Sequence, residues 1–132
     1  MTLLFGETGM TQHDISFLHH EPTKQTFKTC QVIFKEGDSG DVMYGVITGE
    51  IDIIIGGQVV EVAKPGSILG EMALIDNSPR SATAIARTDC KLAVINQKRF
   101  MALIQQTPFF SIQVMGVLAD RLRRWGDTQK SR

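Results

Sequence analysis

The sequence predicts a mainly β fold with flanking α-helices: an antiparallel double-stranded β-helix (a jelly-roll-like β-roll) with short N-terminal helices and C-terminal helices. From Val32 to Val62 the chain is rich in β-branched and aromatic residues, in short runs separated by glycines. No long helical segment separates these runs from the later ones, as a parallel α/β sheet would require. The last third has the apolar spacing of helices.

The length and charge of the chain limit what it can be. Its 132 residues, 42% of them hydrophobic, are enough for one core, so we expect a single domain over residues 1–132. Within it, we expect an N-terminal helical segment at 10–30, a β-roll at 31–96 and C-terminal helices at 97–126. Fourteen basic and fourteen acidic residues cancel, which argues against a general binder of nucleic acid or of anionic membranes.

The sequence also bears on the cellular compartment. It has no apolar run of about 18 residues that would cross a bilayer, and its N-terminus does not look like a signal peptide. We therefore expect a soluble, cytoplasmic domain. Cys30 and Cys90 form no CxxC pair, and we expect both to be reduced and structural rather than bridged or catalytic.

Glycine pairs and turns divide the β-rich part into strands. Thr48-Gly49 and Gly56-Gly57 are suited to tight turns, and Pro65-Gly66 ends a third strand. The expected strands are Val42–Ile47, Glu50–Ile55, Val59–Ala63, Ser81–Arg87 and Lys91–Asn96.

Two helices are expected after the strands. The first spans Gln97–Gln106 and ends at Thr107-Pro108. The second has one apolar stripe at spacings of three, four and three, formed by Met115, Leu118, Leu122 and Trp125. Its other face is expected to be a solvated surface carrying Asp120, Arg121, Arg123 and Arg124.

Specialised residues are concentrated between Gly66 and Ala84. A short helical run, Glu71 to Ile75, follows Gly70 and precedes a turn-rich loop at Asp76 to Pro79. The unpaired N–H groups at the start of a helix and a small residue beside them allow an anion to approach closely. This part of the chain is therefore a candidate phosphate site.

Side chains in this segment suit a nucleotide monophosphate. The guanidinium of Arg80 matches two phosphate oxygens at once, and Ser81 adds a hydroxyl. Glu71 would accept hydrogen bonds from a neutral donor such as a sugar hydroxyl, and the short side chains of Ala73, Ala82 and Ala84 would leave room for a ligand. The residues alone leave a second reading open, in which Glu71 and Arg80 form a structural ion pair with each other.

The segments Gly70-Glu71-Met72-Ala73-Leu74 and Pro79-Arg80-Ser81-Ala82-Thr83 closely resemble the phosphate-binding cassette of the cyclic-nucleotide-binding domain family. That family includes the bacterial catabolite activator, regulatory subunits of cyclic-nucleotide-dependent kinases and cyclic-nucleotide-gated channels. Further similar segments are Phe34-Lys35-Glu36-Gly37-Asp38, Met43-Tyr44, Gly49-Glu50-Ile51 and Pro65-Gly66. The resemblance covers roughly Val32 to Trp125.

The resemblance implies that the ligand is cAMP or cGMP, with no cofactor, metal or catalytic residue. Glu71 would bind the ribose 2′-hydroxyl and Arg80 the exocyclic oxygens of the cyclic phosphate. Ser81 would contact the phosphate or a syn guanine. The ligand-binding set is Leu69, Gly70, Glu71, Met72, Ala73, Arg80, Ser81, Ala82 and Thr83, and the candidates for packing against the base are Ile53, Val60 and Met72.

Two positions depart from the family pattern. Leu69 replaces a common aromatic residue, and Gly45 replaces a bulky apolar one. A lid over the base would come from Leu118 to Arg124, with Arg121, Arg123 and Arg124 as polar candidates.

The expected function is that of a stand-alone, non-enzymatic sensory or regulatory module in which ligand binding is coupled to movement of the C-terminal helices. Those helices would contact a second copy of the chain or an effector protein. The main alternative is a degenerate member of the family that serves as a protein-interaction scaffold. A metal enzyme of the cupin type is disfavoured because no histidine falls between Val32 and Arg132. Specific DNA binding by this chain alone is also not expected.

Overall fold

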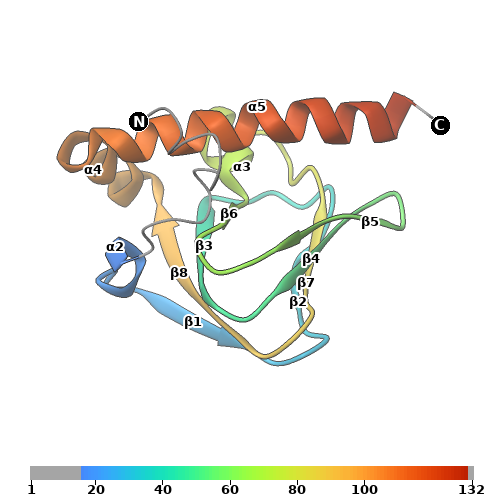
Figure 1. Ribbon diagram of the computed structural model, residues 1–132, viewed down its shortest axis with the longest axis horizontal. Coiled ribbons are helices and arrows are strands. Elements are labelled where there is room, and N and C mark those ends of the chain that lie inside the picture. Colours follow the sequence, from blue (N-terminus) through green and yellow to red (C-terminus); the bar gives the residue numbers. More distant parts are fainter. Residues whose placement is uncertain (1–15, 131–132) are drawn as a thin grey trace, which may run out of the picture.

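The computed structural model describes residues 16–130. Within that range eight strands are followed by two helices, with two shorter helices among the earlier elements (Figure 1). The elements are α2 (Ser16–His19), β1 (Lys24–Phe27), β2 (Val32–Phe34), β3 (Val42–Thr48), β4 (Ile51–Ile55), β5 (Gln58–Ala63), β6 (Ile68–Leu69), α3 (Glu71–Asp76), β7 (Thr83–Ala86), β8 (Cys90–Asn96), α4 (Gln97–Gln106) and α5 (Pro108–Lys130).

The strands form two four-stranded antiparallel sheets, which confirms the mainly β fold predicted from the sequence. One sheet has the order β1-β8-β3-β6 and the other β2-β7-β4-β5. The turn after β3 uses Gly49 at φ +88°, and the β4–β5 hairpin uses Gly56 and Gly57 at φ +57° and +82°. Those positive values are open to glycine without strain, so the turns lie where the glycines predicted them.

One strand lies before the expected start of the roll at residue 31. Strand β1 pairs with β8 from Lys24 opposite Ala93 to Phe27 opposite Cys90. Its residues are polar except for Phe27, the one buried side chain of the four, so the sequence lacks the alternation that marks a half-buried strand. Of the N-terminal helical segment expected at 10–30, the described part holds only α2, and residues 10–15 lie outside the described range.

Two hydrophobic clusters lie on the two faces of the first sheet. The inner cluster fills the roll between the sheets, and includes Tyr44 and Val46 of β3. The second cluster joins Met43 and Ile47 of the same strand to the helices. Because both faces of β3 are buried, it reads as a continuous apolar run instead of an alternating one.

The glycine at position 45 has a packing reason. A Cβ added at Gly45 would lie 2.5 Å from a methyl carbon of Leu18, which comes from α2 and is fully buried. Leu18 therefore fills the space that a larger side chain at position 45 would need. The glycine that departs from the family pattern thus allows α2 to pack directly against β3.

Helix α5 buries a stripe that only partly matches the expected one, which is confirmed at Trp125 and Leu118. Its buried side chains are those of Phe110, Val114, Val117, Arg121 and Trp125, whereas the expected stripe members Met115 and Leu122 are 59% and 65% exposed. The sequence prediction was wrong because it assigned the charged Arg121 to the solvated face. Seen in Figure 1, α5 crosses over the roll beside α3, and this crossing buries the face that carries Arg121.

Candidate functional site

The candidate site is formed where β6 leads through α3 and a loop to β7. Gly70 has φ +78° and precedes α3, and Asn77, at φ +60°, ends the helix by donating its backbone N–H to the carbonyl of Ala73 at 3.0 Å. The Asp76 carboxylate accepts bonds from the backbone N–H and the hydroxyl of Ser78, which orders the loop that follows. The expected sequence of short helix, turn-rich loop and strand is present.

The backbone of Arg80 is fixed at both of its polar groups. Its N–H donates to the carbonyl of Asp38 at 2.7 Å, and its carbonyl accepts from the N–H of Gly37 at 2.8 Å. The arginine is thereby attached to the loop between β2 and β3, more than 40 residues earlier in the chain.

The Arg80 side chain turns inward and is 6% exposed. Nη1 donates to the carbonyl of Gly70 at 3.1 Å, and the guanidinium carbon lies 4.3 Å from the ring centre of Phe34. The Nε–H is buried and has no hydrogen-bond partner in the described part of the chain. A buried charged group with an unused donor is costly, so this guanidinium is suited to an added acceptor.

Two glycines make room for this guanidinium. A Cβ added at Gly40 would lie 2.3 Å from Nε of Arg80, and one added at Gly70 would lie 2.5 Å from Nη1. Gly70 was predicted as a site residue, whereas Gly40 and Phe34 were not. The sequence around Gly40 and Phe34 does not indicate this role, because both residues are distant from Arg80 in the chain and meet it only in the folded structure.

Burial lowers the pKa of the Arg80 guanidinium below its usual value, and the charges of Asp41 and Glu71 only partly oppose that effect. The group remains a cation at neutral pH, since an arginine in a protein stays protonated. A bound anion would add to the charges of Tyr44, Asp41, Glu71 and Asp38, which do not offset the burial by themselves.

Glu71 is 2% exposed and is paired with Arg121, not with Arg80. Its Oε1 accepts from Nη1 of Arg121 at 2.8 Å. The reading in which Glu71 and Arg80 form a structural ion pair with each other is therefore wrong for this structure. Instead, the carboxylate expected to bind a sugar hydroxyl is in contact with the C-terminal helix.

Arg121 connects α5 to the roll through four hydrogen bonds and is 2% exposed. Besides the bond to Glu71, Nε and Nη2 donate to the two oxygens of Glu61 on β5 at 2.9 and 2.8 Å, and Nη2 also donates to the carbonyl of Ile68 at 2.7 Å. Burial disfavours the charge of Arg121, but the Glu71 and Glu61 carboxylates outweigh it and raise its pKa above the usual value. The expectation of a solvated Arg121 was wrong.

The remaining predicted site residues fall into three groups. Leu69, Ala73 and Ala82 are buried. Gly70, Met72 and Thr83 are partly buried, and the Thr83 hydroxyl accepts from the backbone N–H of Glu36 at 2.9 Å. Ser81 is exposed at the start of the segment leading into β7. The set therefore lies along the segment from β6 through α3 and the following loop to β7, but its members differ widely in exposure.

The expected base-packing residues lie in two places. Ile53 belongs to the inner cluster and Val60 packs against it, and Trp125 of α5 is a member of the same cluster. Met72 instead lines a small apolar pocket between α3 and α5, of about 180 Å³, with Ile75, Asp76, Leu118 and Leu122. The sequence identified Trp125 as apolar but gave no reason to place it inside the roll.

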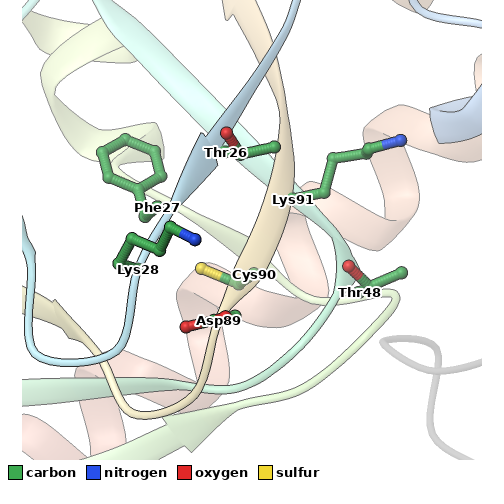
Figure 2. A pocket seen from close by; sticks show the side chains of 7 residues that line it. All are labelled: Thr26, Phe27, Lys28, Thr48, Asp89, Cys90 and Lys91. Atoms are coloured by element: carbon green, nitrogen blue, oxygen red, sulfur yellow. The ribbon is translucent and has the colours of Figure 1, made fainter.

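A separate hollow of about 360 Å³ lies around the end of β1 and the start of β8, far from α3 in Figure 1. Figure 2 shows the side chains that line it, with the amino groups of Lys28 and Lys91 at separate places. The hollow contains none of the predicted site residues, and its two cations do not converge on one point.

No group of three histidine, cysteine, aspartate or glutamate side chains is placed to share a metal ion between residues 16 and 130. In the same range no single helix is long and apolar enough to span a bilayer; α4 and residues 108–125 meet the criterion only as a pair bent by 118°.

The chain is similar to known proteins in both sequence and structure. A family model described as a cyclic nucleotide-binding domain matches residues 24–107. A cAMP-dependent protein kinase regulatory subunit of Dictyostelium discoideum is 42% identical over 108 residues, covering 77% of this chain and 32% of that protein. The cyclic AMP receptor protein of Thermus thermophilus is 35% identical over 96 residues, covering 69% of this chain and 44% of its own length.

A solved structure of cAMP-bound PfPKA-R (141–441) superimposes with a TM-score of 0.67 at 27% identity, covering 79% of this chain and 37% of that one. Of these three proteins, one is named a regulatory subunit and one a receptor protein, and the third is described as cAMP-bound. This chain spans less than half the length of each.

Proposed function

This chain belongs to the cyclic nucleotide-binding domain family, and we propose that it binds a cyclic nucleotide monophosphate, cAMP or cGMP, at the cassette between β6 and β7. In this proposal Arg80 binds the exocyclic oxygens of the cyclic phosphate and Glu71 the ribose 2′-hydroxyl. The observation that carries it is the buried Nε–H of Arg80, which lacks a partner among the described residues and lies in a space kept open by Gly40 and Gly70.

The chemistry of both groups agrees with such a ligand. A guanidinium donates two parallel bonds to an anion, and burial strengthens these bonds because water competes less for the donors. A carboxylate accepts from hydroxyls but repels phosphate, so Glu71 and Arg80 would take opposite ends of a ribose cyclic phosphate.

We also propose the output of the module. Because Arg121 bonds Glu71 directly, a ligand on Glu71 would change the contacts that hold α5, which is the differential interaction that coupling requires. The face of α5 left exposed is apolar at Ile112, Met115 and Leu122. We propose this face as the surface for a second copy of the chain or an effector protein, in a non-enzymatic, cytoplasmic role.

Isothermal titration of the purified chain with cAMP, cGMP and 5′-AMP tests the binding proposal. We expect saturable binding of a cyclic nucleotide and weak binding of 5′-AMP, which lacks the cyclic ester. Arg80→Ala should weaken binding by on the order of 2 to 4 kcal/mol, since it removes charge-assisted bonds to the ligand.

Arg87→Ala is the matched control for Arg80→Ala. Arg87 follows β7, is half-exposed and pairs with Asp52 at 2.9 Å, so it should leave the affinity unchanged. Ser81→Ala should alter the ratio of cAMP to cGMP affinity if its hydroxyl reads the base. Wild-type affinity in Arg80→Ala would overturn the assignment of the site.

One observation favours a second candidate function, the degenerate interaction scaffold. Glu71 and Arg80 are both nearly inaccessible, and the Glu71 carboxylate already has a partner within the chain. If a folded sample bound neither cyclic nucleotide, the scaffold would become the better reading.

A further inference from the structure

One aromatic side chain lies against the guanidinium of the candidate site. The guanidinium carbon of Arg80 lies 4.3 Å from the ring centre of Phe34, and the face of an aromatic ring attracts a cation electrostatically. Phe34 is partly buried and Arg80 is 6% exposed, so this attraction acts where water competes little for the charge. The ring can therefore influence the direction in which the guanidinium points.

The position of Phe34 depends on an irregularity in strand pairing. Val32 lies opposite Ile85 and Phe34 opposite Ala84, so β2 advances by two residues while β7 advances by one. This is the count of a β-bulge, which bends a strand and redirects a side chain. Ala84 is fully buried and small, so the residue opposite Phe34 takes little of the space beside the ring.

Two further aromatic rings hold the Phe34 ring in place. Tyr44 of β3 stacks on Phe34, with ring centres 6.1 Å apart and planes inclined by 22°. Tyr44 in turn meets Phe27 of β1 edge to face, with ring centres 6.4 Å apart. Tyr44 and Phe27 are both buried members of the inner cluster. Because rings in a close-packed interior have few alternative positions, this aromatic row of Phe27, Tyr44 and Phe34 presents a fixed surface to Arg80.

The other contacts of Arg80 leave one of its donors for a ligand. Nη1 donates to the carbonyl of Gly70 at 3.1 Å, and a Cβ added at Gly70 would lie 3.4 Å from Cε2 of Phe34. The backbone at Gly70 is thus close to both side chains. The Nε–H is buried and has no partner in the described part of the chain. Since the ring covers one face of the guanidinium, an anion would bind at its edge, where the N–H groups point.

We propose that Phe34 is a positioning residue: its ring holds the Arg80 guanidinium in the orientation in which the Nε–H can donate to the anionic group of the ligand. This inference rests on the proposed function. An arginine side chain has many rotamers, and ordering such a side chain during binding lowers the affinity by about 2- to 12-fold. Phe34 orders it before the ligand arrives.

Phe34→Leu keeps an apolar side chain but removes the aromatic face. Isothermal titration with cAMP and cGMP should show an affinity about 2- to 12-fold below that of the wild type. Phe27→Leu is the matched control, because it removes a ring of the same aromatic row that meets Tyr44 rather than Arg80, and it should leave the affinity unchanged. An affinity of Phe34→Leu equal to or higher than that of the wild type would overturn the proposal.

The same substitution in an Arg80→Ala background separates positioning from other roles. If Phe34 acts only through the guanidinium, Phe34→Leu should cause no further loss of affinity once the guanidinium is absent. A further loss as large as the one in the wild-type background would show that Phe34 contacts the ligand itself or merely supports the fold, and the proposal would be wrong.

Graded fluorination of the Phe34 ring provides a measurement that a merely structural role would not affect. Mono-, di- and trifluorinated phenylalanine at position 34 reduce the attraction of the ring face for a cation stepwise while changing the ring size little. The affinity for the cyclic nucleotide should fall with each added fluorine. An affinity that is uniform across the series would contradict a role of the ring face in holding Arg80.

The two proposals fail in different ways. If the wild type binds a cyclic nucleotide and Phe34→Leu binds it equally well, the positioning role is wrong and the proposed function stands. If the folded wild type binds neither cyclic nucleotide, the proposed function is wrong and the positioning role falls with it.

Discussion

Gly40→Ala tests the site through a residue that does not itself contact a ligand. The added Cβ would lie 2.3 Å from Nε and 2.4 Å from Cζ of Arg80, against an ordinary contact distance of 3.4 to 4 Å. The guanidinium would therefore have to shift by about 1 Å, which is enough to misalign a hydrogen bond. Each charge-assisted bond contributes about 1.5 to 3 kcal/mol, so the loss of one should weaken nucleotide binding by about 10- to 150-fold.

The fold should tolerate the same change. The atoms that must move are the far end of a flexible side chain, and Gly40 is not among the glycines with positive φ. A glycine to alanine change at a compatible position often stabilises a protein by about 0.4 to 1 kcal/mol, so the free energy of unfolding should change by no more than about 1 kcal/mol.

Titration calorimetry with the cyclic nucleotide and urea unfolding measure the two effects separately. Gly57→Ala is the matched control: its Cβ would meet nothing within 4 Å, but φ is +82°. It should lose about 1 to 2 kcal/mol of stability through backbone strain while keeping its affinity. If Gly40→Ala bound as tightly as the wild type, the inference that Gly40 reserves space for a ligand-binding Arg80 would be refuted.

Three further predictions concern reactivity and stability. Cys30 is exposed, whereas burial raises the pKa of the Cys90 thiol, so a thiol reagent should titrate one cysteine in the native protein and two in denaturant. Leu18→Ala should cost about 2 to 5 kcal/mol in urea unfolding because Leu18 is fully buried, and a smaller loss would show that α2 is not part of the cooperative unit. Burial alone would raise the pKa of Glu61, but the hydrogen bonds from Arg121 outweigh burial and lower this pKa below the ordinary 4.5. The Glu61 carboxylate therefore stabilises the fold fully above pH 4.5, and this stabilisation is lost as the pH falls through the lower pKa of the native state. The stability difference between the wild type and Glu61→Gln should therefore be largest near pH 7 and should narrow in acid; a difference independent of pH would contradict this account.

The local features of the fold could be predicted from the sequence. Glycines at Gly49 and Gly56-Gly57 mark turns because a positive φ favours glycine, and β-branched runs mark the strands between them. Strand β1 escaped prediction because it is held by pairing with β8, not by an apolar pattern of its own. The buried face of α5 was misassigned because an arginine with two carboxylate partners can occupy a core position, and those partners are distant in sequence.

In the candidate site, too, local features could be predicted from the sequence and contacts between distant residues could not. Glu71 and Arg80 were found because they lie in one contiguous segment with a recognisable order of residues. Gly40 and Glu61 were not, since Gly40 acts through its contact with Arg80 and Glu61 through its bonds to Arg121 and Arg124, which are all distant in sequence. Glu61 does interrupt an otherwise apolar run in β5, and that interruption was the available signal of a buried charge partner.

The two ends of α5 pack in different hydrophobic clusters, so the helix can act as a lever that pivots about its first turns. Its first turns are held at Phe110, Val114 and Val117 in the cluster shared with α4, while Arg121, Arg124 and Trp125 attach its later turns to the roll. If Val117 is the fulcrum, a sideways displacement of Arg121 becomes about three times larger at Lys130, because an α-helix rises evenly along its length. A fluorophore attached near Lys130 would therefore report a displacement of Arg121 with more sensitivity than a probe placed at the cassette.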